Sequence, residues 1–426
     1  MKRLLIICAV MMVSASAFAQ KANVKKVKNK VEYSSTPIAY DFSNLEADKV
    51  AELRELIEPA LTNPESKDMA DTWKYACRLK VWEMNQLLKQ YQANNNTFPD
   101  PNAFFQNQYD VVSYYETYVK MMKTPDAKGK LPYKEEEMAK EITTSQLAAK
   151  GARGNLLIAA SNVVYTDPAA AKKYLDLYYE SADNPLFEGL NLKETDPNMP
   201  LGYYIYAVAL KQTGGDEATY VKYLEKSLTT DQGPIACQDL ITFYKEKKDV
   251  ANERKMLEYG FEKFPSVMVF GVNLIQMEFQ DAHYDKCIEL CNNAIERIET
   301  GVAPSENEKG EKIESNKWPY YFKAAALYNQ GKREEAYNAF LKANEINENI
   351  DNLSGAANCC AMLATQNATN AAVSKKWYGE AIKLYEECRT KYPDRSDIWG
   401  YQLYVCYNNT NNVTKANQFK KYSNNK

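Results

Sequence analysis

The chain has a single histidine, His283, among its 426 residues. Histidine is the commonest metal ligand and the usual base beside a serine or cysteine nucleophile. One histidine therefore excludes most zinc sites and most Ser-His-Asp or Cys-His sites built from this chain alone. The motifs GxxxxGK[ST], GxSxG and GxGxxG are also absent. We expect no enzyme activity, no cofactor and no metal site.

Carboxylates are the one catalytic alternative that composition leaves open. The acidic run from Glu135 to Glu137 follows Pro132 and opens a predicted helix. Acidic side chains at that place stabilise the positive end of a helix. Two acids at hydrolase spacing cannot be identified from one sequence, and nothing in the pattern favours such a pair.

After residue 20, no apolar run approaches the roughly 18 residues of a membrane span. The first twenty residues differ, with Lys2 and Arg3 before an apolar run from Leu4 to Val13. This pattern predicts a signal peptide, residues 1–19, cleaved near Ala19/Gln20. We expect an exported protein without an integral membrane span, located in the periplasm, with secretion or outer-membrane association as alternatives.

The chain lacks an excess of positive charge, with 53 Lys and Arg against 56 Asp and Glu. Cleavage of the leader would change the net charge from −3 to −5. This balance argues against a dedicated nucleic-acid binder. The one basic run, from Lys21 to Lys30, lies in residues 20–44. We interpret that segment as a solvated, disordered arm, with attraction to an anionic surface as the alternative.

Nine cysteines are present, and Cys8 lies in the leader after Ile7, a context that does not suit lipid attachment. An even number outside the leader suggests disulfides in an exported chain. Most of these cysteines nevertheless fall where small buried side chains are expected, so we favour reduced core residues, with Cys359 as the commonest exception. Cys287 and Cys291, one helical turn apart, lack the second pair that a metal site requires.

A helical hinge occurs in residues 327–346, LYNQGKREEAYNAFLKANEI. Ala336, Phe340 and Ala343 have the spacing i, i+4, i+7 and would form one stripe on a helix. Gly331, five residues before Ala336, is expected to end the preceding helix because glycine adopts the left-handed conformation at low cost. The segment therefore predicts two antiparallel helices.

The same pattern recurs along the second half of the chain. Glu253 and Cys287 occupy equivalent positions 34 residues apart, and the later equivalents are Ala336, Ala381 and Ala416. Two polar segments, GVAPSENEKGEKIESN and TQNATNAAVS, account for the longer intervals between them. A fixed period of this length indicates stacked helix pairs, and no alternating strand pattern is present.

YNQGKREEAYNAFLKA and WYGEAIKLYEECRTKYP resemble the tetratricopeptide repeat (TPR) family, with Cys388 in place of an alanine. Ala324 and Lys323 depart from the family's glycine and leucine, and Glu253 departs from its alanine. The resemblance extends from about Pro234 to Tyr422 and is fainter before that. It implies an all-α fold, a right-handed α-solenoid of stacked antiparallel helix pairs. Together with the predicted signal peptide, it suggests an exported bacterial TPR protein. We expect a divergent TPR-like region at 45–200 and TPR-like repeats at 201–426.

In the family, the first helix of each pair lines a concave surface that binds peptides. Carried onto this sequence, the candidate binding residues are Trp318, Tyr321, Tyr328, Asn329, Gln276 and Phe279. The lysine and asparagine clamp that some members use for a C-terminal carboxylate is absent, with Tyr321 and Ala325 at its positions in one repeat. Acidic C-terminal tails are therefore disfavoured as ligands.

The resulting functional hypothesis is an exported, non-catalytic scaffold that binds a protein or peptide of the cell envelope. The alternative, suggested by 32 tyrosines and five tryptophans, is a glycan-binding protein resembling the helical-repeat proteins of glycan uptake. Homo-oligomer formation is left open by the sequence.

Overall fold

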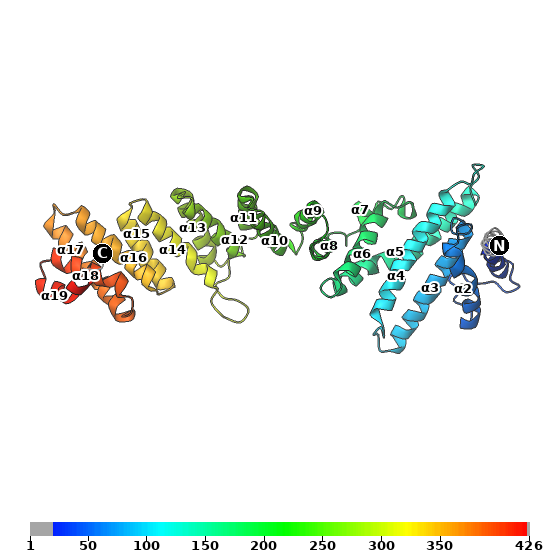
Figure 1. Ribbon diagram of the computed structural model, residues 1–426, viewed down its shortest axis with the longest axis horizontal. Coiled ribbons are helices and arrows are strands. Elements are labelled where there is room, and N and C mark those ends of the chain that lie inside the picture. Colours follow the sequence, from blue (N-terminus) through cyan, green and yellow to red (C-terminus); the bar gives the residue numbers. More distant parts are fainter. Residues whose placement is uncertain (1–19, 424–426) are drawn as a thin grey trace, which may run out of the picture. The chain divides into compact units, whose positions relative to one another are not determined.

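The computed structural model describes residues 20–423, and the predicted signal peptide, residues 1–19, lies outside them. Within the described residues the regular structure is entirely helical, and the one β contact is an isolated bridge between Glu306 and Lys312. Figure 1 shows helices that follow one another in chain order. The chain divides into two compact units, the first ending at Gly233 and the second beginning at Pro234.

The first unit consists of a helix over residues 20–32 and eight further α-helices. These are α2 (Ala47–Thr62), α3 (Ala70–Ala93), α4 (Pro101–Lys123), α5 (Glu135–Val163), α6 (Pro168–Glu180), α7 (Leu192–Thr195), α8 (Leu201–Gln212) and α9 (Glu217–Ser227), with 3-10 turns η1 (Ser181–Asp183) and η2 (Pro185–Phe187). Successive long helices pack against each other from α2 to α6, and α8 packs between α6 and α9.

Several helices begin where their sequences predict. Asp167 caps α6 by accepting a hydrogen bond from the Ala170 amide, and Pro168 occupies the first turn. Asp100 accepts from two amides at the start of α4, again just before a proline. Proline is favoured there because its missing N–H has no partner inside the helix in any case.

The prediction of a disordered arm was wrong for residues 20–32. These residues form a helix that packs onto the first unit. Val24, Val27 and Val31 are 1%, 0% and 6% exposed and join the core formed by α2 and α3. Lys28 makes an ion pair of 3.0 Å with Asp71. The lysines dominate the composition of this segment, but the valines form the apolar stripe that makes it a helix.

The second unit contains α10 (Gly233–Glu246), whose first residue ends the first unit, and nine further α-helices. These are α11 (Val250–Lys263), α12 (Met268–Gln280), α13 (Tyr284–Glu299), α14 (Trp318–Asn329), α15 (Arg333–Ile346), α16 (Ile350–Gln366), α17 (Ala371–Lys391), α18 (Ser396–Asn409) and α19 (Val413–Phe419), with η3 (Glu314–Lys317) and η4 (Lys420–Tyr422). From α11 onward each helix packs against the next, and α12, α14, α16 and α18 also contact their alternate neighbours. The predicted all-α fold of consecutively packed helix pairs is confirmed.

The predicted hinge is present between α14 and α15. Gly331 has φ of 80° and follows the C-terminal residue of α14 by two positions. The Gly331 amide donates to the Tyr328 carbonyl, and the Lys332 amide donates to the Leu327 carbonyl, which closes the end of the helix. The two predicted insertions behave differently. Residues 301–313 form a loop, whereas most of the second insertion lengthens α16 and α17.

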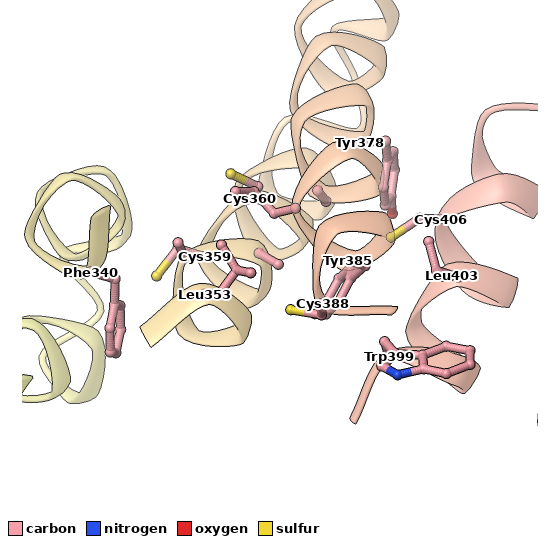
Figure 2. Packing of buried hydrophobic residues seen from close by; sticks show 14 of the residues in the cluster. Phe340, Leu353, Cys359, Cys360, Tyr378, Tyr385, Cys388, Trp399, Leu403 and Cys406 are labelled. Atoms are coloured by element: carbon pink, nitrogen blue, oxygen red, sulfur yellow. The ribbon is translucent and has the colours of Figure 1, made fainter. Parts of the chain in front are cut away.

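Small side chains let the helices of the second unit approach closely. Ala324, Ala336, Ala356 and Ala381 are fully buried in its C-terminal core cluster. Figure 2 shows larger residues of the cluster, including Phe340 of α15, Tyr385 of α17 and Leu403 of α18. Because each helix pair covers apolar surface of the next, stability is shared between neighbouring repeats.

The cysteines belong to these cores. All eight that the structure describes are free and buried; they are Cys77, Cys237, Cys287, Cys291, Cys359, Cys360, Cys388 and Cys406. Four of them are labelled in the core cluster of Figure 2. Cys359, expected as the commonest exception, is likewise unpaired. The cysteines therefore act as small apolar side chains, as their sequence positions predict.

No helix in the described part of the chain combines the length and apolar character that a membrane span requires.

Candidate binding groove

One face of α14 presents side chains toward the first helices of the neighbouring pairs. Tyr321, Ala325, Tyr328 and Asn329 have the spacing i, i+4, i+7, i+8 and so lie on one side of the helix. On either side of α14, the helices α12 and α16 contact it. Tyr321 and Tyr328 are half-buried, whereas Asn329 is exposed. The first helices of three successive pairs thus contribute to one surface.

Two adjoining pockets lie on this surface. Pocket A, of about 310 Å³, is lined by Phe279, Tyr321, Ala325, Tyr328, Asn329, Phe340, Asp351, Ser354, Gly355 and Asn358. Pocket B, of about 390 Å³, is lined by Lys317, Trp318, Tyr321, Asn347, Asn349, Asp351 and Asn352. Tyr321 and Asp351 line both, so we call the two pockets together the groove.

Aromatic rings form much of the groove's apolar surface. Tyr321 has its ring centroid 6.1 Å from that of Trp318 at 83°, and 6.4 Å from that of Phe340. Phe322 connects Trp318 with Phe279 through centroid distances of 6.0 and 5.4 Å. Trp318 is 41% exposed, which is high for so large an apolar side chain. The rings therefore pack on each other while one of them remains available to a ligand.

Polar groups of α16 complete the walls. The Tyr385 hydroxyl donates to Asn358 Oδ1 at 2.5 Å, which fixes the amide at the edge of pocket A. In pocket B, Asn352 is 2% exposed, and its Nδ2 donates to the Asn347 carbonyl at 2.9 Å. Among residues 20–423, the buried Oδ1 of Asn352 has no hydrogen-bond partner. The groove thus combines apolar rings with amide groups.

Two charged side chains line the groove. Lys317 is ion-paired with Glu314, and its Nζ lies 5.5 Å from the centroid of the Trp318 ring. Asp351 is exposed, and within residues 20–423 no basic side chain lies within 4.0 Å of its carboxylate. Burial and, after it, the charge of Asp351 raise the pKa of the Tyr321 hydroxyl. Asp351 is therefore the acid of the groove that has no ion pair, and it lies beside an aromatic ring. Its charge also acts on Arg395, whose guanidinium is paired with Asp397.

The structure brings together most of the predicted binding residues. Phe279, Tyr321, Tyr328 and Asn329 all line pocket A, and Trp318 lines pocket B with Tyr321. Gln276 is exposed on α12 but lines neither pocket.

The residues of α16 were missed by the sequence prediction. Asp351, Ser354, Gly355 and Asn358 have the spacing i, i+3, i+4, i+7, the same one-sided pattern as on α14. The stripe contains no aromatic residue, so it carried no signal for a binding surface. The one signal in the sequence for these residues is their helical spacing, which repeats the spacing of the binding residues on α14.

Other residues with chemical potential are held in structural contacts. His283 Nδ1 lies 2.8 Å from Glu278 Oε2, and Arg254 makes an ion pair with the same carboxylate. Cys287 and Cys291 are buried one helical turn apart, and the neighbouring Cys291 thiol lowers the pKa of Cys287. Within residues 20–423, no group of three or more His, Cys, Asp or Glu side chains is placed to hold a metal ion.

Comparison of the sequence with known protein families and with curated proteins finds no match. The functional interpretation therefore depends on the groove and on the sequence patterns described above.

Proposed function

We propose that this chain is an exported, non-catalytic scaffold of the TPR type that binds a protein or peptide segment of the cell envelope in the groove. The observation that supports the proposal most strongly is the continuity of pockets A and B across α12, α14 and α16, with Tyr321 in both. Export is inferred from the signal-peptide pattern of residues 1–19.

The groove has the composition that peptide recognition requires. Apolar side chains of a ligand would contact Phe279, Tyr321 and Tyr328, while its backbone groups would find amide partners on Asn329 and Asn358. Half-buried aromatic residues that line hollows are the usual centres of binding energy in protein interfaces. A surface built from successive helix pairs also suits an extended or helical segment, because each pair adds contacts along the ligand.

The test is a pull-down from envelope extract with the mature chain as bait. The double variant Tyr321→Ala/Tyr328→Ala removes two rings from pocket A, and we expect at least one partner to be lost. Each deletion of a central interface ring costs about 2 kcal/mol, roughly a thirtyfold loss of affinity. Tyr165→Ala is the matched control, because Tyr165 is 73% exposed and belongs to the first unit. Retention of every partner by a folded double variant would reject the groove as the binding surface.

A glycan ligand is the second candidate, and the exposure of Trp318 beside Tyr321 is the observation that favours it. Sugar rings stack on exposed aromatic faces, and the amides of pocket B could bond to hydroxyl groups. Micromolar binding on a glycan array that is abolished by Trp318→Ala, without any protein partner in the pull-down, would replace the peptide proposal.

A further inference from the structure

We infer that the groove selects a cationic side chain, an arginine in preference to a lysine, whose charged head lies beside Asp351 where pockets A and B meet. The inference rests on the proposed function, because it assigns the chemistry of the segment that the groove would bind.

The first support is the balance of charge. Lys317 is the one basic residue among the lining residues of both pockets, and its ammonium is already paired with Glu314. Asp351 lines both pockets and has no ion-pair partner within the described residues. Arg395, on which the charge of Asp351 also acts, is itself paired with Asp397. The remaining charge at the meeting point is therefore negative. A cation bound there would gain an opposite charge without displacing an existing partner.

The second support is the aromatic surface beside this carboxylate. Tyr321 lines both pockets together with Asp351, and the exposed ring of Trp318 is edge-on to it at 6.1 Å. A cation within about 6 Å of an aromatic face is attracted by the negative face of the ring. A guanidinium is planar and weakly hydrated, so it stacks on such rings better than an ammonium does. This distinction favours arginine.

The third support is the set of acceptors in pocket B. A guanidinium has five N–H donors, so a single carboxylate leaves most of them without a partner. Asn347 and Asn349 line pocket B. The Asn349 Oδ1 already caps α16 and the Asn347 carbonyl already accepts from Asn352 Nδ2, which leaves the side-chain oxygen of Asn347, without a hydrogen bond in residues 20–423, as an acceptor beside Asp351. The pocket therefore supplies what an arginine head needs, whereas an acidic ligand would face Asp351.

The experiment uses the mature chain labelled with fluorotryptophan, which gives one ¹⁹F signal for each of its five tryptophans. The signal of Trp318 is assigned with Trp318→Phe. Three probes are titrated: the N-acetyl, N′-methylamide derivatives of arginine, citrulline and glutamate. Citrulline has the shape of arginine but no charge. The arginine probe should shift the Trp318 signal until saturation and should have the lowest apparent Kd of the three. Its Kd should be about fivefold lower than that of citrulline, because one exposed ion pair contributes up to about 1 kcal/mol.

Variants of the carboxylate decide the cause of this preference. Asp351→Asn should remove the difference between arginine and citrulline, and Asp351→Glu should restore it, which also shows that the site still folds. Glu335→Gln, an exposed acid in the first turn of α15, should leave the preference unchanged. Added salt should weaken arginine binding in the wild-type chain and leave citrulline binding nearly constant.

Equal binding of arginine and citrulline, tighter binding of glutamate, or no shift of the Trp318 signal would each overturn the inference. Its failure is separate from that of the proposed function. If Tyr321→Ala/Tyr328→Ala still loses a partner while the probes show no charge preference, the scaffold role stands and only the cationic anchor is rejected. Arginine selectivity without any groove-dependent partner would support the site and reject the scaffold role.

Discussion

Gly355 of α16 lies against the ring of Phe340 of α15, such that a Cβ added at residue 355 would stand 2.7 Å from Phe340 Cε1. The same relation occurs two helix pairs earlier, where a Cβ at Gly271 would meet Phe261 Cε2 at 2.5 Å. In both places an aromatic ring of the preceding second helix occupies the space that a side chain on the next first helix would need. The absence of a side chain is what lets these consecutive helices approach.

We therefore expect Gly355→Ala to destabilise the protein. Alanine favours the helix by about 1 kcal/mol, but overpacking a core contact costs typically 1–3 kcal/mol, so the net change should be a loss. Gly379→Ala on α17 is the matched control, because nothing lies within 4 Å of an added Cβ there, and it should stabilise. Urea unfolding followed by circular dichroism measures both. Stabilisation by both substitutions would show that Phe340 moves away freely.

The helix at residues 20–32 should contribute measurably to the stability of the first unit. Val27 is fully buried in the core with α2 and α3, so Val27→Ala should lower the free energy of unfolding by about 2 kcal/mol, as for other buried methyl deletions. Lys25→Ala on the exposed side of the same helix should change it by less than about 0.5 kcal/mol. Thermal melts of a chain that begins at residue 20 compare the two. Identical melts for both variants would mean that this helix is detached in solution.

Glu116 of α4 should make the stability of the first unit depend on pH. Burial and, after it, the charge of Glu180 raise the pKa of Glu116 from 4.5 to about 7, against a smaller lowering by Arg153. Its buried Oε1 has no hydrogen-bond partner within residues 20–423. The folded state therefore binds the proton more tightly than the unfolded state. The stability from this group is present below pH 4.5 and is lost as the pH rises toward 7.

The loss amounts to about 3 kcal/mol, since one pKa unit corresponds to about 1.4 kcal/mol. Glu116→Gln should remove this dependence. It should stabilise the protein at pH 8 by up to that amount and change little at pH 4.5, whereas the exposed Glu55→Gln should have no effect at either pH. Urea midpoints measured at both pH values test the expectation. A pH profile of Glu116→Gln parallel to that of wild type would contradict it.

The thiols should be protected in the folded protein. Burial raises the pKa of Cys359, Cys360, Cys388 and Cys406 to about 12, and the thiolate is the reactive form. Iodoacetamide at pH 8 should therefore modify none of these four within minutes under native conditions. Unfolding without reductant should allow modification of all eight described cysteines, read by intact mass. A lower number after unfolding would reveal a disulfide.

The parts of the fold that the sequence predicted are those that local signals determine. Gly331 ends α14 through its own backbone conformation, and Asp167 with Pro168 starts α6 through a local cap. The period of small residues predicted the stacked pairs, because each pair needs a small side chain at the same place, where its two helices approach closely. By contrast, lysines dominate the composition of residues 20–32 and obscure the stripe of valines there. The groups that these valines and Lys28 contact, in α2 and α3, lie farther along the chain.

The groove was predicted only in part, because only some of its residues carry a local signal in the sequence. Tyr321 and Tyr328 are recognisable because aromatic residues on a helix face carry a signal of their own. Asp351, Ser354 and Asn358 become binding candidates only when α16 is placed beside α14, and their types are common on any helix surface. These residues line the groove because α14 lies beside them, and their residue types alone do not predict it.

Gly355 also lines pocket A, together with the Phe340 ring against which it packs. A larger side chain at residue 355 would push α16 away from α15 and so change the shape of pocket A. Changes in what this surface accepts are therefore expected at the rim, at exposed positions such as Asn329 and Asp351, whose replacement leaves the spacing of the pairs intact.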